Sequence, residues 1–199
     1  MSQFIESIRI ENGQMELIDY HNIRFNSTRK LFYCADKDYD LNSFIQIPGK
    51  FKKALVKCRI LYDMEVRDVQ FSFYEPQNIK SLKLINASIN YEHKSIDRFH
   101  LELLKKTAFP ADEVLIVNNG KISDTSFSNI IFRKKKKWFT PNSPLLAGVR
   151  REYLLNEGII EEISICPSDL KIFDSFMLIN ALLPFDLSRA LPIQNILDL

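Results

Sequence analysis

The chain has 199 residues, of which 46% are hydrophobic and 26% charged, and its formal net charge is +2. This composition can supply an apolar core, and the near-neutral balance argues against polyanion binding as the main function. No apolar run approaches the roughly 20 residues that span a bilayer, and the first residues do not resemble a signal peptide. Three widely spaced cysteines fit no metal-ligand pattern. We therefore expect a cytoplasmic globular protein with no membrane segment and no bound metal.

The beginning of the chain predicts two strands followed by a helix. Residues 6–11 alternate polar and apolar side chains, as a half-buried strand does, and Asn12-Gly13 is a strong hairpin-turn signal. From Asp19, taken as the N-cap, the pattern changes to a spacing of three to four residues. This spacing predicts a helix whose buried stripe consists of Tyr20, Ile23, Ser27, Leu31 and Cys34.

The middle of the chain is rich in β-branched and aromatic residues. Three such runs, at residues 54–62, 69–74 and 80–86, are separated by short acidic or proline-containing turns. They predict a meander of strands. Residues 43–51 have a weaker helical spacing, which Pro48-Gly49 interrupts.

The second half of the chain mixes helices and strands. Residues 96–106 predict an amphipathic helix with Phe99, Leu103 and Leu104 on its apolar side. The remaining predicted elements are strands at 113–118, 130–133, 137–139 and 176–180, and a helix at 148–156 that Gly158 stops. This order predicts an α+β fold with a smaller lobe over residues 1–88 and a larger lobe over residues 89–199.

A run of four lysines, residues 134–137, is the only charge cluster of note. Because it falls in a predicted hairpin turn, it is more typical of a solvated loop than of a nucleic-acid surface. We expect no nucleic-acid partner.

Three segments carry residues that could act chemically. Lys94 lies in a polar connection before a helix, where a desolvated lysine could act as a nucleophile, although most such lysines face solvent. Residues 123–129 place hydroxyl side chains around Asp124 between two strands, which a simple turn also explains. Residues 144–151 enter a helix through Gly148, and free N–H groups at a helix start favour an anion such as phosphate. None of the three is specific alone.

Their order and spacing together resemble the class IV aminotransferases, the pyridoxal-phosphate enzymes of fold type IV. The matching block consists of Lys94 with Arg98, the Asp124–Asn129 segment, Thr140-Pro141, and the Leu-x-Gly-x-x-Arg pattern that ends at Arg151. Two further runs fit the resemblance. His21-Asn-Ile-Arg24 is similar to the segment that delivers a phosphate-binding arginine, and Asn180-Ala-Leu-Leu-Pro-Phe185 is similar to a run of the 4-amino-4-deoxychorismate lyase branch.

The resemblance implies a two-lobed fold of the D-amino acid aminotransferase type, a homodimer, an amino-acid substrate, and pyridoxal 5′-phosphate as cofactor. Lys94 is implied to form the internal aldimine and then to shuttle the proton at the substrate Cα. Asp124 is implied to pair with the pyridine nitrogen.

The resemblance also implies which groups hold the phosphate. Arg24 would bind it together with the backbone N–H groups of Val149 and Arg150. Asn180 and Ala181 would lie beside it on the last strand.

Three features depart from the family pattern. Asp124 is one methylene shorter than the family's glutamate, Arg150 replaces a threonine, and the chain starts later than typical members. We favour a 4-amino-4-deoxychorismate lyase that gives pyruvate and 4-aminobenzoate. The alternatives are an aminotransferase acting on a small amino acid, of the branched-chain or D-amino acid type, and a non-catalytic shortened relative.

Overall fold

The computed structural model describes residues 2–197, and the chain forms two compact units. Unit 1 comprises the chain up to Pro76 together with His93–Asp97, and unit 2 comprises Gln77–Glu92 and the chain from Arg98 onward. This division differs from the predicted boundary between residues 88 and 89.

The segment that carries Lys94 belongs to unit 1, not to the C-terminal lobe in which it was expected. Backbone pairing explains the difference. The N–H of Ile5 donates to the carbonyl of Lys94 at 2.9 Å, and the N–H of Ile96 donates to the carbonyl of Gln3 at 3.0 Å. Lys94 is thereby fixed along the first strand of the chain.

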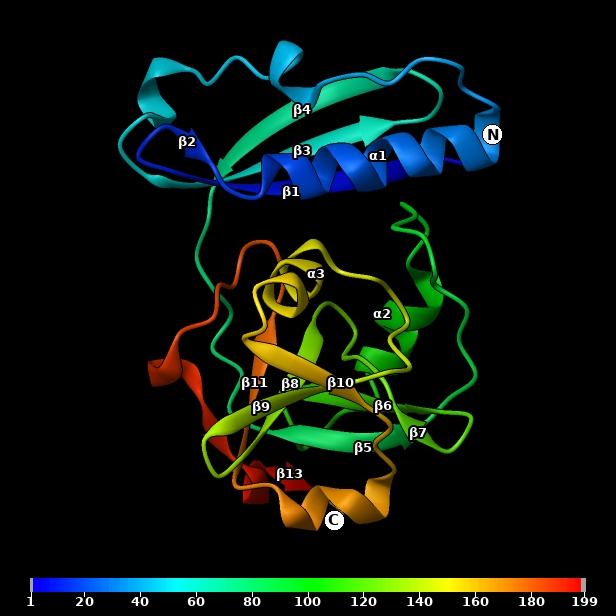
Figure 1. Cartoon of the computed structure of the whole chain (residues 1–199), viewed down its shortest axis with the longest axis vertical. Coiled ribbons are helices and arrows are strands. Elements are labelled where there is room, and N and C mark those ends of the chain that lie inside the picture. The colour runs from blue at the N-terminus through cyan, green and yellow to red at the C-terminus, as the bar shows by residue number, and fades with distance from the viewer. Residues whose placement is uncertain (1, 198–199) are drawn as a thin grey trace. The chain divides into compact units, whose positions relative to one another are not determined.

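Unit 1 is built on an antiparallel sheet in the order β2-β1-β3-β4, with helix α1 packed on one face (Figure 1). The elements are β1 (Phe4–Glu11), β2 (Gln14–Met15), α1 (Ile18–Tyr33), β3 (Leu55–Tyr62) and β4 (Val66–Phe73). The predicted hairpin turn is confirmed, because Asn12 and Gly13 both have positive φ, 51° and 77°. The interrupted helix at 43–51 is replaced by two short 3-10 turns, Leu41–Ser43 and Gly49–Phe51.

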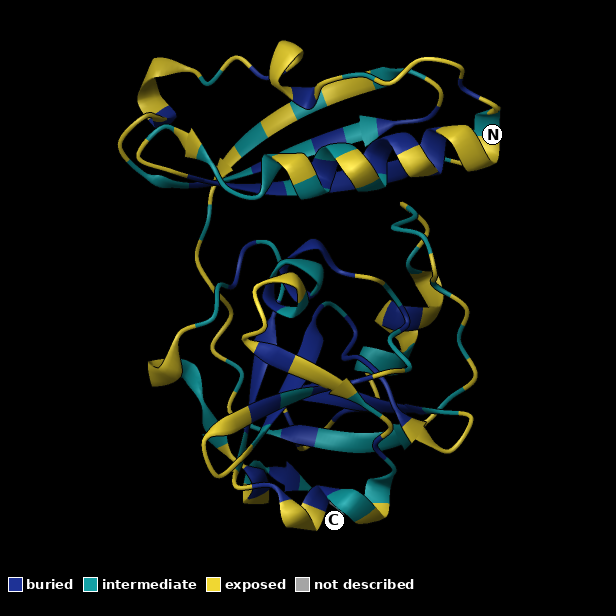
Figure 2. Cartoon of the chain, viewed as in Figure 1, coloured by how far each residue is buried: buried dark blue, intermediate teal, exposed yellow. Residues whose placement is uncertain are grey.

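The buried face of α1 is the opposite of the predicted one. The buried side chains are those of His21, Phe25, Asn26, Thr28 and Arg29, whereas Ile23 and Leu31 of the predicted stripe are 66% and 64% exposed. Figure 2 shows buried and exposed positions alternating along this helix. Asp19 is also not the N-cap, which is Leu17 in a left-handed conformation. Apolar spacing failed here because polar groups of the helix find partners inside unit 1.

Unit 2 contains two sheets with α2 and α3 on their outer sides. The five-stranded sheet has the order β10-β9-β8-β11-β12, and the four-stranded sheet has the order β13-β5-β6-β7. The strands are β5 (Leu82–Asn86), β6 (Glu113–Asn118), β7 (Lys121–Ile122), β8 (Asn129–Lys134), β9 (Lys137–Pro141), β10 (Ile160–Ile163), β11 (Ser175–Ile179), β12 (Leu191–Pro192) and β13 (Ile196–Leu197). The run at 80–86 therefore does not continue the meander, because β5 pairs in parallel with β6 in another sheet.

Strand alternation divides the interior of unit 2 into layers. Ile130 and Phe132 of β8 lie in a core shared by both sheets, whereas Ile131 faces a separate cluster with Leu154 of α3 (Val149–Asn156). On the other side, Val114 of β6 packs with α2 (Phe99–Lys105). Successive side chains of a strand point to opposite faces, so each strand serves two layers.

The predicted apolar side of α2 is only partly correct. Leu104 is half-buried and packs in the cluster with Val114, but Phe99 and Leu103 are 65% and 52% exposed and Leu101 is the buried residue.

No helix in the described part of the chain is long and apolar enough to cross a membrane.

The orientation of α1 can be tested by replacing one residue on each face. Phe25→Ala removes a fully buried ring and should lower the free energy of unfolding by roughly 3–5 kcal/mol. Ile23→Ala on the exposed face should change it by only about 0.5 kcal/mol. Urea denaturation followed by circular dichroism measures both values. The reverse ranking would mean that the helix packs through its apolar stripe.

Candidate active site

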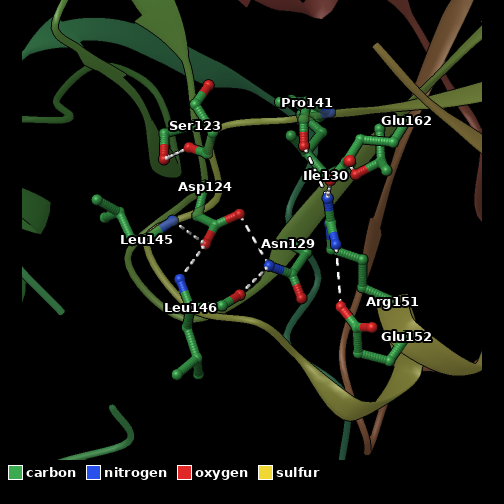
Figure 3. A network of polar contacts seen from close by, with 12 residues as sticks. Ser123, Asp124, Asn129, Ile130, Pro141, Leu145, Leu146, Arg151, Glu152 and Glu162 are labelled. Atoms are coloured by element: carbon green, nitrogen blue, oxygen red, sulfur yellow. Dashed lines mark hydrogen bonds and ion pairs between the residues drawn. The ribbon is translucent and has the colours of Figure 1, made fainter. Parts of the chain in front are cut away.

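The segment predicted to carry an acidic cofactor ligand lies in unit 2 between β7 and β8. Ser123 and Asp124 continue the pairing with β6, because the Ile116 backbone accepts from the Ser123 N–H and donates to the Asp124 carbonyl, both at 2.9 Å. The backbone of Asp124 is therefore fixed by its pairing with β6, and its side chain points toward the segment that precedes α3 (Figure 3).

The Asp124 carboxylate is buried and accepts three hydrogen bonds. Oδ1 accepts from Nδ2 of Asn129 at 2.9 Å, and Oδ2 accepts from the N–H groups of Leu145 at 2.9 Å and Leu146 at 3.1 Å. Burial raises the pKa of Asp124 to about 6, while these donors and the Arg151 charge act in the opposite direction. The carboxyl consequently changes its protonation within the physiological range.

Asn129 links this carboxylate to the start of α3. Its Nδ2 also donates to the carbonyl of Leu146 at 2.9 Å. Gly148, the N-cap of α3, packs so closely on Asn129 that a Cβ atom would overlap Oδ1 and lie 3.2 Å from Cγ. Only a residue without a side chain fits here.

Arg151 fixes the first turn of α3 from the other side (Figure 3). Its Nη2 donates to the carbonyl of Pro141 at 3.0 Å and to Glu162, and its Nη1 pairs with Glu152 at 3.1 Å. The helix start is thus tied both to the Asp124 loop and to β9 and β10.

The predicted residues after β11 lie in a tight turn that contacts the same region of unit 2. Oδ1 of Asn180 accepts from the N–H groups of Leu182 at 2.8 Å and Leu183 at 3.0 Å, and its Nδ2 donates to the Phe127 carbonyl at 3.4 Å. Arg150 reaches the carbonyl of Ala181 at 3.5 Å. In unit 2, the turn after β11 therefore contacts the loop that follows Asp124 through Asn180 and the first turn of α3 through Ala181.

The other two predicted residues, Lys94 and Arg24, lie together in unit 1. Both charges act on buried His21 and lower its pKa, although burial is the larger cause and Glu6 acts in the opposite direction. Lys94 is paired along β1 by its backbone, and Arg24 projects from the same face of α1 as His21. The two basic groups are thus presented beside one buried cluster.

Sequence reasoning missed Glu6 as a member of this cluster. Its Oε1 accepts from Nε of Arg24 at 2.9 Å, and its Oε2 accepts from Nη2 of Arg24 at 2.5 Å and contacts Nδ1 of His21 at 2.6 Å. A signal was present, because Glu6 shares the strand parity of Ile8 and Ile10, which face the core. A carboxylate on the buried row of a strand indicates that a basic or hydrogen-bonding side chain pairs with it.

Among the described residues, no group of three or more histidine, cysteine or acidic side chains could hold a metal ion.

Residues 3–185 match the family model described as amino-transferase class IV. The chain belongs to this family. It is 37% identical over 185 residues to an uncharacterized protein of Haemophilus influenzae, covering 92% of this chain and 98% of that protein.

Solved structures agree with the family assignment. A crystal structure from Haemophilus somnus 129PT, named as a candidate 4-amino-4-deoxychorismate lyase, is 32% identical with a TM-score of 0.85, covering 93% of this chain and 98% of that chain. The pyridoxal-phosphate-bound form of a hypothetical aminotransferase from Mycobacterium tuberculosis shares the fold, with a TM-score of 0.76 at 14% identity, covering 98% of this chain and 81% of that chain. The expected two-lobed α+β fold of this family is therefore confirmed.

The close contact at the start of α3 can be tested with two glycine variants. Gly148→Ala should destabilise the protein by about 1–3 kcal/mol, because Asn129 is held by Asp124 and Leu146 and cannot yield easily. Gly49→Ala is the matched control, since a Cβ atom there meets nothing within 4 Å and should change stability by less than about 1 kcal/mol. Urea denaturation measures both. Equal effects would contradict the close approach at Gly148.

The environment of Asp124 predicts a specific pH dependence of stability. Its folded pKa of about 6 exceeds the ordinary value of 3.8, so its contribution to stability is complete below pH 3.8 and is lost as the pH rises through 6. Between pH 4 and pH 7, wild type should lose about 2 kcal/mol more unfolding free energy than Asp124→Asn, which cannot titrate. Parallel pH profiles for the two proteins would show that the carboxyl is not desolvated.

Proposed function

We propose that this chain is a pyridoxal-phosphate-dependent 4-amino-4-deoxychorismate lyase that releases pyruvate and 4-aminobenzoate. The observation that carries the proposal is the placement of Lys94 and Arg24 beside one buried cluster in unit 1. The choice of reaction is supported by the name of the Haemophilus somnus protein and by the run from Asn180 to Phe185.

The chemistry of the donor set fits this cofactor. The primary amine of Lys94 suits its aldehyde, and the guanidinium of Arg24 suits its phosphate. Gly148 has no side chain that could take the first N–H groups of α3, the backbone donors that an anion prefers. Asp124 suits the pyridine nitrogen: Oδ2 already accepts two hydrogen bonds and Oδ1 accepts one, so Oδ1 retains an acceptor position.

When bound, pyridoxal phosphate supplies an electron sink for the carbon that bears the substrate amino group. Lys94 would hold the cofactor through Nζ and, once the substrate amine replaces it, take the proton from that carbon. As the bond to the enolpyruvyl group breaks, Lys94 would pass this proton to the departing enolpyruvate, which leaves as pyruvate. As the resemblance implies, Arg24 of unit 1 would bind the phosphate, and the N–H groups of Val149 and Arg150, with Asn180 and Ala181, would be the phosphate ligands that unit 2 supplies. Asp124 would keep the pyridine nitrogen protonated.

We also propose that the chain acts as a homodimer on a small-molecule substrate that carries an amino group, as the resemblance implies. Light scattering on the purified protein measures the mass in solution directly.

The proposed role of Lys94 predicts a residue-specific covalent adduct. Pyridoxal phosphate added to wild type should give an absorbance band that borohydride bleaches, with the reduced label on Lys94 by peptide mass. Lys94→Ala should lose the band and the label, because the proposal assigns the aldehyde to this one amine. Lys121→Ala, an exposed lysine of unit 2, is the matched control and should keep both. A label spread over many lysines in both variants would contradict the proposal.

The lyase and aminotransferase reactions can be distinguished because only the aminotransferase needs a keto acid as amino-group acceptor. A lyase releases pyruvate from 4-amino-4-deoxychorismate without any keto acid, and Lys94→Ala should abolish this release. Turnover that depends on an added keto acid would identify an aminotransferase on a small amino acid instead. A labelled Lys94 without either activity would indicate a non-catalytic relative.

A further inference from the structure

Unit 1 contains a buried acid and a buried imidazole to which the resemblance gives no role. We propose that Glu6 and His21 are positioning residues that fix the guanidinium of Arg24, and thereby determine how tightly the phosphate of the cofactor is held. The proposal rests on the proposed function, because it assigns Arg24 to the phosphate.

The location of Glu6 requires an explanation. Its side chain is 0% exposed and lies on the core-facing row of β1 between Phe4 and Ile8, opposite Ile60 of β3. A carboxylate in such a row costs several kcal/mol unless it is paired and hydrogen-bonded. An apolar residue would serve the core better, so the acid indicates a task other than packing.

The contacts of Glu6 fix both the plane and the direction of the arginine. Nε and Nη2 of Arg24 donate to the two different oxygens of Glu6, at 2.9 Å and 2.5 Å. This two-point contact defines one orientation of the planar guanidinium. The Glu6 side chain is completely buried, whereas that of Arg24 is 16% exposed, so the arginine extends from the buried acid toward the surface.

His21 completes the support. It lies three residues before Arg24, on the same face of α1, and its Nδ1 contacts Oε2 of Glu6 at 2.6 Å. Because an ionised carboxylate only accepts, Nδ1 is the donor. Oε2 thus has two donors from one helix, which prevents the acid from turning away. Nε2 of His21 is buried and has no hydrogen-bond partner among the described residues, so the imidazole is held through Glu6.

The charges around the cluster agree with this role. Burial acts to raise the pKa of Glu6, but the Arg24 charge and the His21 contact outweigh it and hold that pKa at about 2. Burial, with Arg24 and Lys94, lowers the pKa of His21, and the phenol of Tyr62 faces the same acid with its pKa raised by burial. At neutral pH the cluster therefore consists of one anion, one guanidinium and a neutral imidazole.

The test compares pyridoxal phosphate with pyridoxal, which has the same aldehyde but no phosphate. Dissociation constants for both come from the absorbance of the adduct on Lys94. Glu6→Gln removes one acceptor for Arg24 and should weaken pyridoxal phosphate about tenfold or more while changing pyridoxal less than about twofold. Glu16→Gln is the matched control, since Glu16 pairs with Arg9 at 2.7 Å in the same unit and should leave both constants unchanged.

Other outcomes for Glu6→Gln overturn the proposal. Equal weakening of both aldehydes would mean that Glu6 serves the fold in general. Tighter binding of pyridoxal phosphate would mean that Glu6 only neutralises the charge of Arg24. If Glu6→Gln does not fold, Glu6→Asp keeps the charge but shortens the reach, and the same selective loss is expected. His21→Asn should give a smaller loss, about threefold, also confined to pyridoxal phosphate.

Failure of the proposed function would look different. If wild type forms no adduct with either aldehyde, the lyase proposal falls, and inorganic phosphate then tests the inference alone. Phosphate should raise the thermal midpoint of wild type and of Glu16→Gln more than that of Glu6→Asp. An equal rise in all three proteins, or no rise in wild type, would overturn the positioning role.

Discussion

A buried carboxylate is stable only if donors or an opposite charge replace its lost water, and both units of this chain bury one. In unit 1 Glu6 is satisfied by Arg24 and His21, and in unit 2 Asp124 is satisfied by Asn129 and two backbone N–H groups. In unit 1 the donors lie on α1, which carries the proposed phosphate ligand Arg24, and in unit 2 they fix Asp124, itself a proposed ligand. The requirement to satisfy the acid therefore also fixes the proposed ligands.

Both acids are buried and hydrogen-bonded, but their pKa values shift in opposite directions. Glu6 has a guanidinium in direct contact, and its pKa falls to about 2 in spite of complete burial. The hydrogen bonds to Asp124 come from neutral N–H groups, the Arg151 charge has a weaker effect, and burial raises the pKa of Asp124 to about 6. At Glu6 the contact with a full charge outweighs desolvation, whereas at Asp124 the neutral hydrogen bonds do not. Glu6 is thus a permanent anion, and Asp124 is an acid whose charge a cationic pyridine nitrogen would stabilise.

The sequence predicted local elements well and long-range partners poorly. The strand at 113–118 and the Asn12-Gly13 turn follow from local propensity, and α3 begins one residue after its predicted start. The buried face of α1 could not follow from apolar spacing, because His21 and Arg29 are buried by contacts with Glu6 and the Met64 carbonyl, distant in the chain. The parallel partner of β5 was missed for the same reason.

In the candidate site, too, the sequence predicted the residues with chemistry of their own but not the residues that support them. Lys94, Arg24 and Asp124 came from a family pattern, which records groups with chemistry of their own. Their supports are set by tertiary contacts: Glu6 meets Arg24 across 18 residues of chain, and Asp124 meets Leu145 across 21. Each support forms inside a single unit, so the orientation of each proposed ligand is set by the packing of a strand against a helix or loop. A residue such as Gly148 or Glu6 then acts on affinity through the geometry of its neighbours, although it takes no part in bond making.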